Sequence, residues 1–280
     1  MKIILAGADG MLGSDMLTLL NTEGVDVKPL YYPAFNYSKP DSVASALQNE
    51  DFDVLINCTA YTRVDDCETN QEEALLVNVK GPEMLADICR EKSALLVHFS
   101  TDYVFDGEKP EPYIESDATG PINEYGRTKL EGEKVIIASG VRHLIIRTAW
   151  LYGHNGPNFV KTMLKIGETR SELKVVADQN GSPTFTRDLA LKSREIIDRG
   201  LEGIVHITNQ EYCTWAEYAE EIFKLAGLNV KINKCSTEEY PKPAKRQKNS
   251  RLQNQRLIEA GIPLLRSWKD ALREYIENGK

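Results

Sequence analysis

The first twenty residues of the chain constrain its fold more than any other segment. Gly7, Gly10 and Gly13 stand between an apolar run over residues 2–6 and an amphipathic stretch over 11–21. Glycines between a strand and a helix let the backbone turn tightly and approach a pyrophosphate, whose charge meets the free N–H groups of the helix. The GxxGxxG spacing therefore favours a dinucleotide-binding turn, and an ordinary strand-to-helix turn is the alternative.

Short apolar runs alternate with longer amphipathic stretches through the first half of the chain. Further strands are predicted at 53–57, 95–99 and 143–147, and further helices at 71–91 and 123–139. Alternation at this spacing requires right-handed crossovers and produces a mostly parallel, twisted sheet. The expected fold class is α/β, with a Rossmann-type doubly wound sheet.

The pattern loosens after about residue 150, where glycines and prolines interrupt it. Helices are expected at 158–168 and 186–199, strands at 173–177 and 203–207, and a loop at 180–185. Residues 1–150 are thus predicted to form a dinucleotide-binding domain. Residues 151–280 are predicted to form mainly a smaller C-terminal substrate-binding cap, with about 186–207 returning to the main sheet. Ligands of open α/β sheets lie at the carboxyl ends of the strands, below such a cap.

Composition excludes several classes of protein. A net charge of −8 argues against a nucleic-acid partner. Five cysteines without a CxxC pair suit a reducing compartment and provide no zinc ligand set. The apolar start is too short for a secretory signal, and no window approaches the roughly 18 apolar residues of a membrane span. We therefore expect a cytoplasmic protein with no membrane partner.

A single YxxxK motif, Tyr125 to Lys129, falls in the predicted helix 123–139, where positions i and i+4 share a face. A lysine ammonium one turn away is expected to lower the pKa of the phenol and make it an acid–base group. Thr101 lies just after the strand 95–99, where a hydroxyl can reach a substrate carbonyl. Taken alone, each feature has a plain structural alternative, namely a solvent-facing helix pair and a turn-forming hydroxyl. His98 and His206 are interpreted as core histidines without a catalytic role.

The end of the predicted second strand leaves the cofactor preference open. No Asp or Glu lies between Lys28 and Asn36 to bind an adenosine ribose, and no arginine is present to bind a 2′-phosphate. The sequence therefore does not choose between NADPH and NADH.

Several longer strings resemble one family. STDYVFDG at 100–107 resembles a motif of the dTDP-4-dehydrorhamnose reductases, an extended branch of the short-chain dehydrogenase/reductase superfamily. The resemblance extends along the chain through INCTAYTRVDDCE (56–68), PINEYGRTKLEGE (121–133), RTAWLYG (147–153), DQNGSPTFTRDLA (178–190) and KRQKNSRL (245–252). It implies NAD(P)H-dependent reduction of the C4 ketone of a nucleotide-linked 4-keto-6-deoxy-L-sugar, most simply dTDP-4-dehydro-L-rhamnose to dTDP-L-rhamnose.

The resemblance also implies roles for residues at matching positions. The expected catalytic residues are Thr101, Tyr125 and Lys129. The expected cofactor-binding residues are Gly7, Gly10, Met11, Leu12, Gly13, Asn36, Tyr37, Ala60, Tyr61, Thr62 and Phe99, together with Tyr125 and Lys129. The expected substrate-binding residues are Thr101, Asp102, Tyr103, Trp150, Arg246, Asn249 and Ser250.

Some positions depart from the family pattern. Asn36 stands where the family has an aspartate, and Gln247 stands where it has a proline. Some members bind magnesium at a dimer interface; Asp15 matches one such acid, but Arg187 falls where another is needed, so no metal is assigned. A homodimer is expected only from general frequency. Two alternatives stay open: a reductase or epimerase acting on another nucleotide sugar, and a cofactor-binding regulatory subunit without turnover.

Overall fold

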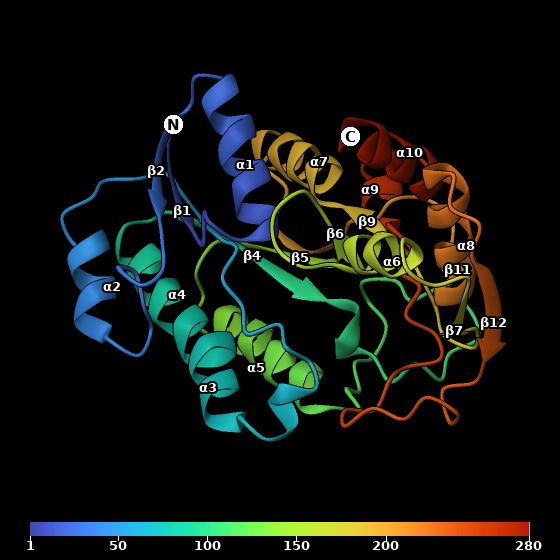
Figure 1. Ribbon diagram of the computed structural model, residues 1–280. Helices are drawn as coiled ribbons and strands as arrows, with labels where there is room; N and C mark the ends of the chain where they lie inside the picture. The colour runs from blue at the N-terminus through green and yellow to red at the C-terminus, as the bar shows by residue number, and fades with distance from the viewer. Residues whose placement is uncertain (280) are drawn as a thin grey trace.

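A parallel sheet of six strands forms the centre of the larger part of the molecule in the computed structural model, which describes residues 1–279 (Figure 1). From edge to edge the strands are β2 (Asp26–Leu30), β1 (Lys2–Ala6), β3 (Val54–Asn57), β4 (Leu95–Thr101), β5 (His143–Thr148) and β10 (Gly203–His206). The chain runs from β1 outward to β2 and then continues on the other side of β1 with β3. This switch opens a crevice at the carboxyl ends of β1 and β3. The predicted Rossmann-type doubly wound sheet is confirmed.

Helices cover both faces of this sheet. α1 (Met11–Thr22) and α7 (Thr186–Asp198) lie on one face, and α2 (Pro40–Leu47), α4 (Gly81–Glu91) and α5 (Glu124–Ala138) lie on the other (Figure 1). Successive residues of a strand point to opposite faces. Accordingly Ile3 and Leu5 of β1 belong to the core under α1 and α7, whereas Ile4 belongs to the core under α2, α4 and α5. Burial on both faces explains why the strands are almost continuously apolar.

The helix expected at 71–91 is present but is not regular. It consists of α3 (Gln71–Leu75), a π-helical turn over Leu76–Lys80, and α4. Asn78 in the π turn is buried; its oxygen accepts the Tyr61 backbone N–H at 2.8 Å, and its amide donates to the Thr128 hydroxyl at 3.1 Å. Gly132 is required opposite it, because a Cβ there would lie 2.2 Å from the Asn78 carbonyl oxygen. The irregular turn therefore holds the loop around Tyr61 against α5.

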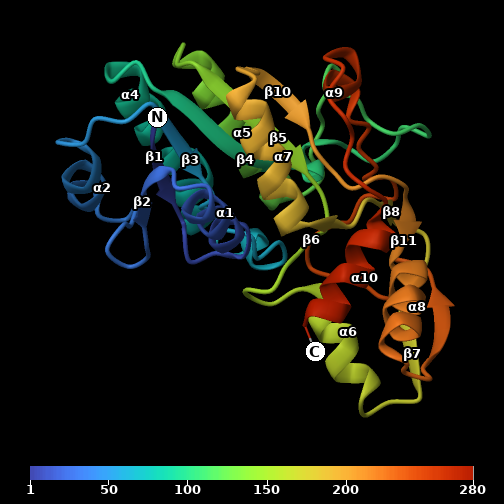
Figure 2. The same ribbon diagram turned by 90° about the horizontal axis from the view of Figure 1, so that it is seen from above.

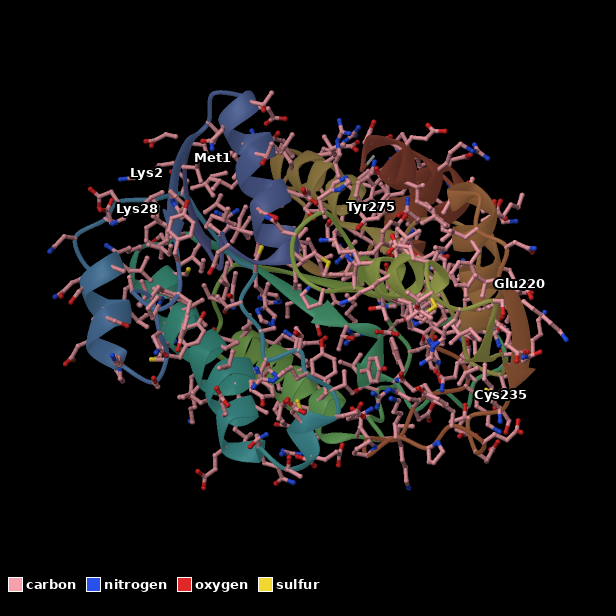
Figure 3. The ribbon with its side chains drawn as sticks, viewed as in Figure 1. Met1, Lys2, Lys28, Glu220, Cys235 and Tyr275 are labelled. Carbon is pink, nitrogen blue, oxygen red and sulfur yellow. The ribbon has the colours of Figure 1, made fainter. Side chains whose placement is uncertain are left out.

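The C-terminal part packs beside the carboxyl ends of the strands. It contains α6 (Phe159–Gly167), β7 (Glu172–Val176), α8 (Trp215–Ala226), β12 (Lys231–Cys235), α9 (Gln255–Glu259) and α10 (Trp268–Asn278), with β7 and β12 paired in parallel (Figure 2). The segment expected as a loop at 180–185 instead supplies two short strands, β8 (Asn180–Gly181), which pairs with β11 (Cys213–Thr214), and β9 (Thr184–Phe185), which pairs with β6 (Leu151–Tyr152). Figure 3 shows Lys2 and Lys28 at the opposite end of the molecule from Glu220 and Cys235. Within residues 1–279, no helix combines the length and apolarity that crossing a bilayer requires.

Candidate active site

The glycine turn between β1 and α1 has the geometry that an anion site needs. Gly7 has a φ of 76°, and its N–H donates to the carbonyl of Leu30 at 3.0 Å. A Cβ on Gly13 would lie 2.0 Å from the Gly7 oxygen, so the turn closes only with glycine there. No side chain caps α1, which begins at Met11. The N–H groups of its first turn therefore lack a side-chain acceptor, and a pyrophosphate is a fitting partner for them.

A cleft of about 670 Å³ opens beside this turn. It is bounded by the glycine turn, the loop after β2, the loop after β3 and the helical segment that begins with α3. Six of the residues expected to bind the cofactor line it: Gly7, Gly10, Asn36, Tyr37, Ala60 and Tyr61. The other seven expected residues are not among its lining residues: Met11, Leu12, Gly13, Thr62, Phe99, Tyr125 and Lys129. Leu12 and Phe99 belong to the core beneath α1. The cleft's size, its position at the strand-order switch and the uncapped α1 fit a dinucleotide.

Sequence reasoning missed part of the cleft wall. Tyr32 and Phe35 follow β2, and Thr59 follows β3, and all three line the cavity. Tyr32 is 69% exposed, so its ring forms an open rim of the cavity. Asn36 accepts hydrogen bonds from the backbone N–H and the hydroxyl of Ser38, at 2.9 and 2.8 Å, which orients its amide group. The aromatic residues that follow the second strand are the signal in the sequence for this wall.

Tyr125 lies on the first turn of α5, where it is buried. The helix is capped by Asn123, whose side chain accepts the Gly126 N–H at 2.8 Å. The Tyr125 ring meets Tyr103 edge to face, with centroids 5.4 Å apart, and shares an apolar cluster with Tyr61 of the cleft wall. Burial raises the pKa of Tyr125, the charge of Asp102 adds to this, and the Thr101 hydroxyl partly opposes it. The expected lowering of this pKa by Lys129 is thus wrong for the free protein, since burial dominates.

Lys129 lies one turn further along α5 and is 2% exposed. Its Nζ donates to the Phe99 carbonyl at 2.7 Å and lies 3.2 Å from Nε2 of His98. Burial lowers the pKa of Lys129 to about 8, although the carboxylate of Glu133 on the next turn opposes the shift. That carboxylate is itself held by Arg147 of β5, with a shortest N–O distance of 2.6 Å. Phe99 contributes through its carbonyl, which fixes the end of the lysine side chain.

The end of β4 carries the residues expected to face the substrate. The Thr101 hydroxyl donates to Oδ1 of Asp102 at 2.8 Å, and Oδ2 of Asp102 is buried with no partner among residues 1–279. Burial raises the pKa of Asp102 to about 6, and the nearby hydroxyls of Thr101 and Ser250 partly oppose this shift. A buried carboxylate oxygen without a donor is uncommon in a native fold, which makes Asp102 a candidate for a functional contact.

Trp150 is held in a conformation that a bulky residue rarely adopts. Its φ is 48°, and its ring stacks on Trp215 with centroids 3.5 Å apart. Its Nε1 donates to the Ser250 hydroxyl at 3.2 Å. A Cβ on Gly181 would lie 2.3 Å from the Trp150 ring, so glycine is needed beneath it. Backbone strain of this kind concentrates at ligand sites, and the Trp215 partner was not foreseen from the sequence.

The remaining expected substrate contacts are used largely within the fold. Arg246 pairs with Asp65 at 2.9 Å and lies over the ring of Tyr103, which is half-buried. The Asn249 amide donates to the carbonyls of Lys109 and Glu111, at 2.6 and 2.8 Å. These contacts fasten the segment around residues 245–250 over the end of β4. Asn249 therefore has a structural use that sequence reasoning did not assign.

The residues considered for a metal are engaged elsewhere. Asp15 accepts the hydroxyl of Thr186 at 2.5 Å, and Arg187 pairs with Glu274 at 2.7 Å. In the described part of the chain, no group of three or more His, Cys, Asp or Glu residues is arranged to hold a metal ion. All five cysteines are unpaired thiols.

Comparisons with known proteins agree along the whole chain. A family model described as RmlD substrate binding domain matches residues 1–280. The spore coat polysaccharide biosynthesis protein SpsK of Bacillus subtilis is 40% identical over 99% of this chain and 97% of its own. A crystal structure of a dTDP-4-dehydrorhamnose reductase from Clostridium acetobutylicum has a TM-score of 0.96 and 44% identity over 99% of both chains. The Bacillus anthracis dTDP-4-dehydrorhamnose reductase in complex with NADP has a TM-score of 0.96 and 37% identity over 99% of this chain and 100% of its own.

Proposed function

The chain belongs to the RmlD substrate binding domain family, and we propose that it reduces the C4 ketone of dTDP-4-dehydro-L-rhamnose with NADPH or NADH, giving dTDP-L-rhamnose. The observation that carries this proposal is a cluster of three polar side chains at the end of β4 and the start of α5, next to Tyr61 of the cleft wall. A buried phenol, Tyr125, lies near the Thr101 hydroxyl, and the adjacent Asp102 has a free carboxylate oxygen.

The chemistry divides between the cofactor and the protein. When bound, the reduced nicotinamide supplies a hydride to the sugar C4. Tyr125 is protonated at neutral pH because burial raises its pKa, so it can donate its phenolic proton to the developing C4 alkoxide. The carbonyl carbon thereby gains a hydride and its oxygen gains a proton. The phenolate left on Tyr125 is then reprotonated from solvent.

Other side chains would bind and orient the sugar. Thr101 would donate to the same C4 oxygen when its hydroxyl turns from Asp102. Oδ2 of Asp102 would accept a sugar hydroxyl, and the Trp150 ring would pack against the sugar or the base. Arg246 would approach the diphosphate, where its guanidinium fork suits phosphate oxygens. For Asn249 we propose an indirect role, in which it holds Ser250 in place.

On the cofactor side, Gly7, Gly10 and Gly13 with Met11 and Leu12 would hold the pyrophosphate, and Asn36 with Tyr37 would hold the adenosine ribose. Ala60, Tyr61, Thr62 and Phe99 would line the nicotinamide half, with Tyr125 and Lys129 at its end. For the whole protein we propose a cytoplasmic location, which five free thiols support, and a homodimer.

A turnover assay tests the proposal. The protein is mixed with dTDP-4-dehydro-L-rhamnose and either NADPH or NADH, and the absorbance of the reduced cofactor is followed. We expect cofactor oxidation matched by formation of dTDP-L-rhamnose. Other nucleotide-linked 4-keto sugars serve as controls. Cofactor binding without turnover of any of them would contradict the proposal and favour a regulatory subunit.

A further inference from the structure

The proposed dinucleotide cleft has one end where the glycine turn meets the end of β2. The backbone N–H groups of Gly7 and Ala8 both donate to the Leu30 carbonyl, at 3.0 and 3.2 Å. These hydrogen bonds hold the turn, with Asp9, beside the loop that follows β2, and both Asp9 and Tyr32 of that loop line the cleft. In Rossmann-type sheets the adenosine ribose binds at the end of the second strand, so its 2′ position would lie between these two segments.

The charged residues that line this cleft are all acidic. They are Asp9 of the glycine turn and Glu72 and Glu73 of α3. Among residues 1–279, no lysine or arginine lines the cleft. Of the three carboxylates, only that of Glu73 has an ion-pair partner in the described chain, and this partner, Arg63, is 3.9 Å away. The cleft therefore presents negative charge to a ligand.

Two cations near the cleft are already held by other groups. Arg63 contacts Asp66 and the hydroxyl of Tyr61, each at 2.8 Å. Lys28 of β2 pairs with Glu50 at 2.8 Å. Neither cation is among the residues that line the cleft. In their observed positions they provide no phosphate contact there.

The wall after β2 offers neutral groups instead. Tyr32, Phe35 and Asn36 line it. The backbone N–H of Ser38 can only donate, and it lies 2.9 Å from the side-chain oxygen of Asn36, so the amide nitrogen of Asn36 is the group left for a ligand. A neutral amide can pair with a ribose hydroxyl, but it cannot balance the charge of a phosphate. Lys39 is exposed and lies outside the lining.

Building on the proposed function, we propose that this cleft selects NADH over NADPH, with Asp9 and Tyr32 as specificity-determining residues. The two cofactors differ in the 2′-phosphate, which adds a charge of about −1.5 to −2 at neutral pH. The pyrophosphate that both cofactors carry meets the N–H groups of the glycine turn. The additional phosphate of NADPH would instead meet a carboxylate and a neutral ring, and like charges in a partly desolvated cleft repel each other.

Calorimetric titration of the free protein with NADH and with NADPH tests the proposal without a sugar substrate. At low salt we expect the Kd for NADPH to exceed that for NADH by about tenfold. The ratio of the two Kd values should approach one in about 1 M NaCl, where the Debye length is about 3 Å. Equal Kd values at low salt, or tighter binding of NADPH, would overturn the proposal and leave the proposed function standing. Failure to bind either dinucleotide would overturn both.

Removing the charge of Asp9 tests its part in the selection. Asp9→Asn should lower the ratio of the Kd for NADPH to that for NADH by about threefold at low salt, because one repelling charge is lost. Asp41→Asn is the matched control, since it removes an exposed carboxylate from the first turn of α2, outside the cleft. It should leave the ratio unchanged. Equal responses of the two variants would overturn the role of Asp9.

Adding a cation at residue 32 should reverse the preference. Tyr32 is 69% exposed, so the fold should accept Tyr32→Arg. A guanidinium there can bind the 2′-phosphate, and we expect the Kd for NADPH to fall by about 10–100-fold with little change for NADH. Tyr240→Arg adds the same charge at a 48% exposed tyrosine outside the cleft and should change neither Kd. Equal gains for both cofactors in Tyr32→Arg would overturn the role of Tyr32.

Discussion

The two sides of the active site treat buried polar groups in opposite ways. On the proposed cofactor side, the side chains of Asn57 and His98 form hydrogen bonds with neighbouring residues of the protein. Toward the substrate, Ser100 Oγ, Asp102 Oδ2 and Thr148 Oγ1 at the ends of β4 and β5 are buried without a partner among the described residues. Leaving a buried polar atom unpaired costs about 1–3 kcal/mol. The proposed cofactor side is therefore preorganised, whereas the proposed substrate side keeps unpaired acceptors and donors.

The largest effect should come where the two sides meet, at Tyr125. Tyr125→Phe removes the proton donor and keeps the ring that packs on Tyr103. We expect turnover to fall by about 10²–10⁴-fold, the usual worth of a general acid. The Kd for NADPH, measured by fluorescence, should hardly change. A variant that keeps most of its turnover would remove Tyr125 from the mechanism.

A preorganised cofactor side should tolerate no added atoms. Gly13→Ala would place a Cβ 2.0 Å from the Gly7 oxygen, so the turn must open. Overpacking of this kind costs about 1–3 kcal/mol, and we expect dinucleotide affinity to fall by about 10–100-fold. Gly120→Ala is the matched control, because its nearest neighbour would be 3.6 Å away. Calorimetric titration compares the two, and equal affinities would show that the turn is not preorganised.

A substitution on the proposed substrate side should weaken sugar binding and leave dinucleotide binding unchanged. Asp102→Asn weakens the acceptor that we propose for a sugar hydroxyl, and it leaves the glycine turn intact. Since a hydrogen bond to a charged group contributes about 1.5–3 kcal/mol, KM for the keto sugar should rise by about 10–100-fold. The Kd for the dinucleotide serves as the control and should stay the same. A loss of dinucleotide affinity of similar size would mean that the two sides are not independent.

Lowering the pH should have a smaller effect, which is also confined to substrate affinity. Below its pKa of about 6, Asp102 is protonated and loses its charge, so substrate affinity at pH 5 should be about tenfold weaker than at high pH. This pKa is above the ordinary 3.8, so protonation favours the folded state. Its contribution to the free energy of unfolding should therefore fall as the pH rises from about 4 to about 6. Urea titrations should show this slope in the wild type and not in Asp102→Asn.

The sequence predicted the sheet well because its strands are marked locally. The runs at 53–57 and 95–99 are apolar on both faces, and the structure has β3 at Val54–Asn57 and β4 at Leu95–Thr101. Gly7 and the YxxxK motif likewise carry their signal within a few residues. Short pairs such as β8 with β11 depend on partners far along the chain, and no local pattern marks them.

The features of the site that the sequence did not predict likewise depend on residues far apart in the chain. The polar partners of the buried His98 are Asn57 and Lys129, which reach it from different elements. The pKa of Tyr125 depends on burial, which the spacing from residue 125 to 129 does not report. Trp215 is found against Trp150 only once the C-terminal part is folded.

The most direct test of the account follows a labelled hydride. The protein is given dTDP-4-dehydro-L-rhamnose with NADPH carrying deuterium at nicotinamide C4, and the product is analysed by NMR. We predict deuterium at sugar C4 in dTDP-L-rhamnose, formed by the wild type and lost in step with turnover in Tyr125→Phe. A product without deuterium at C4, or equal labelling rates in both proteins, would contradict it.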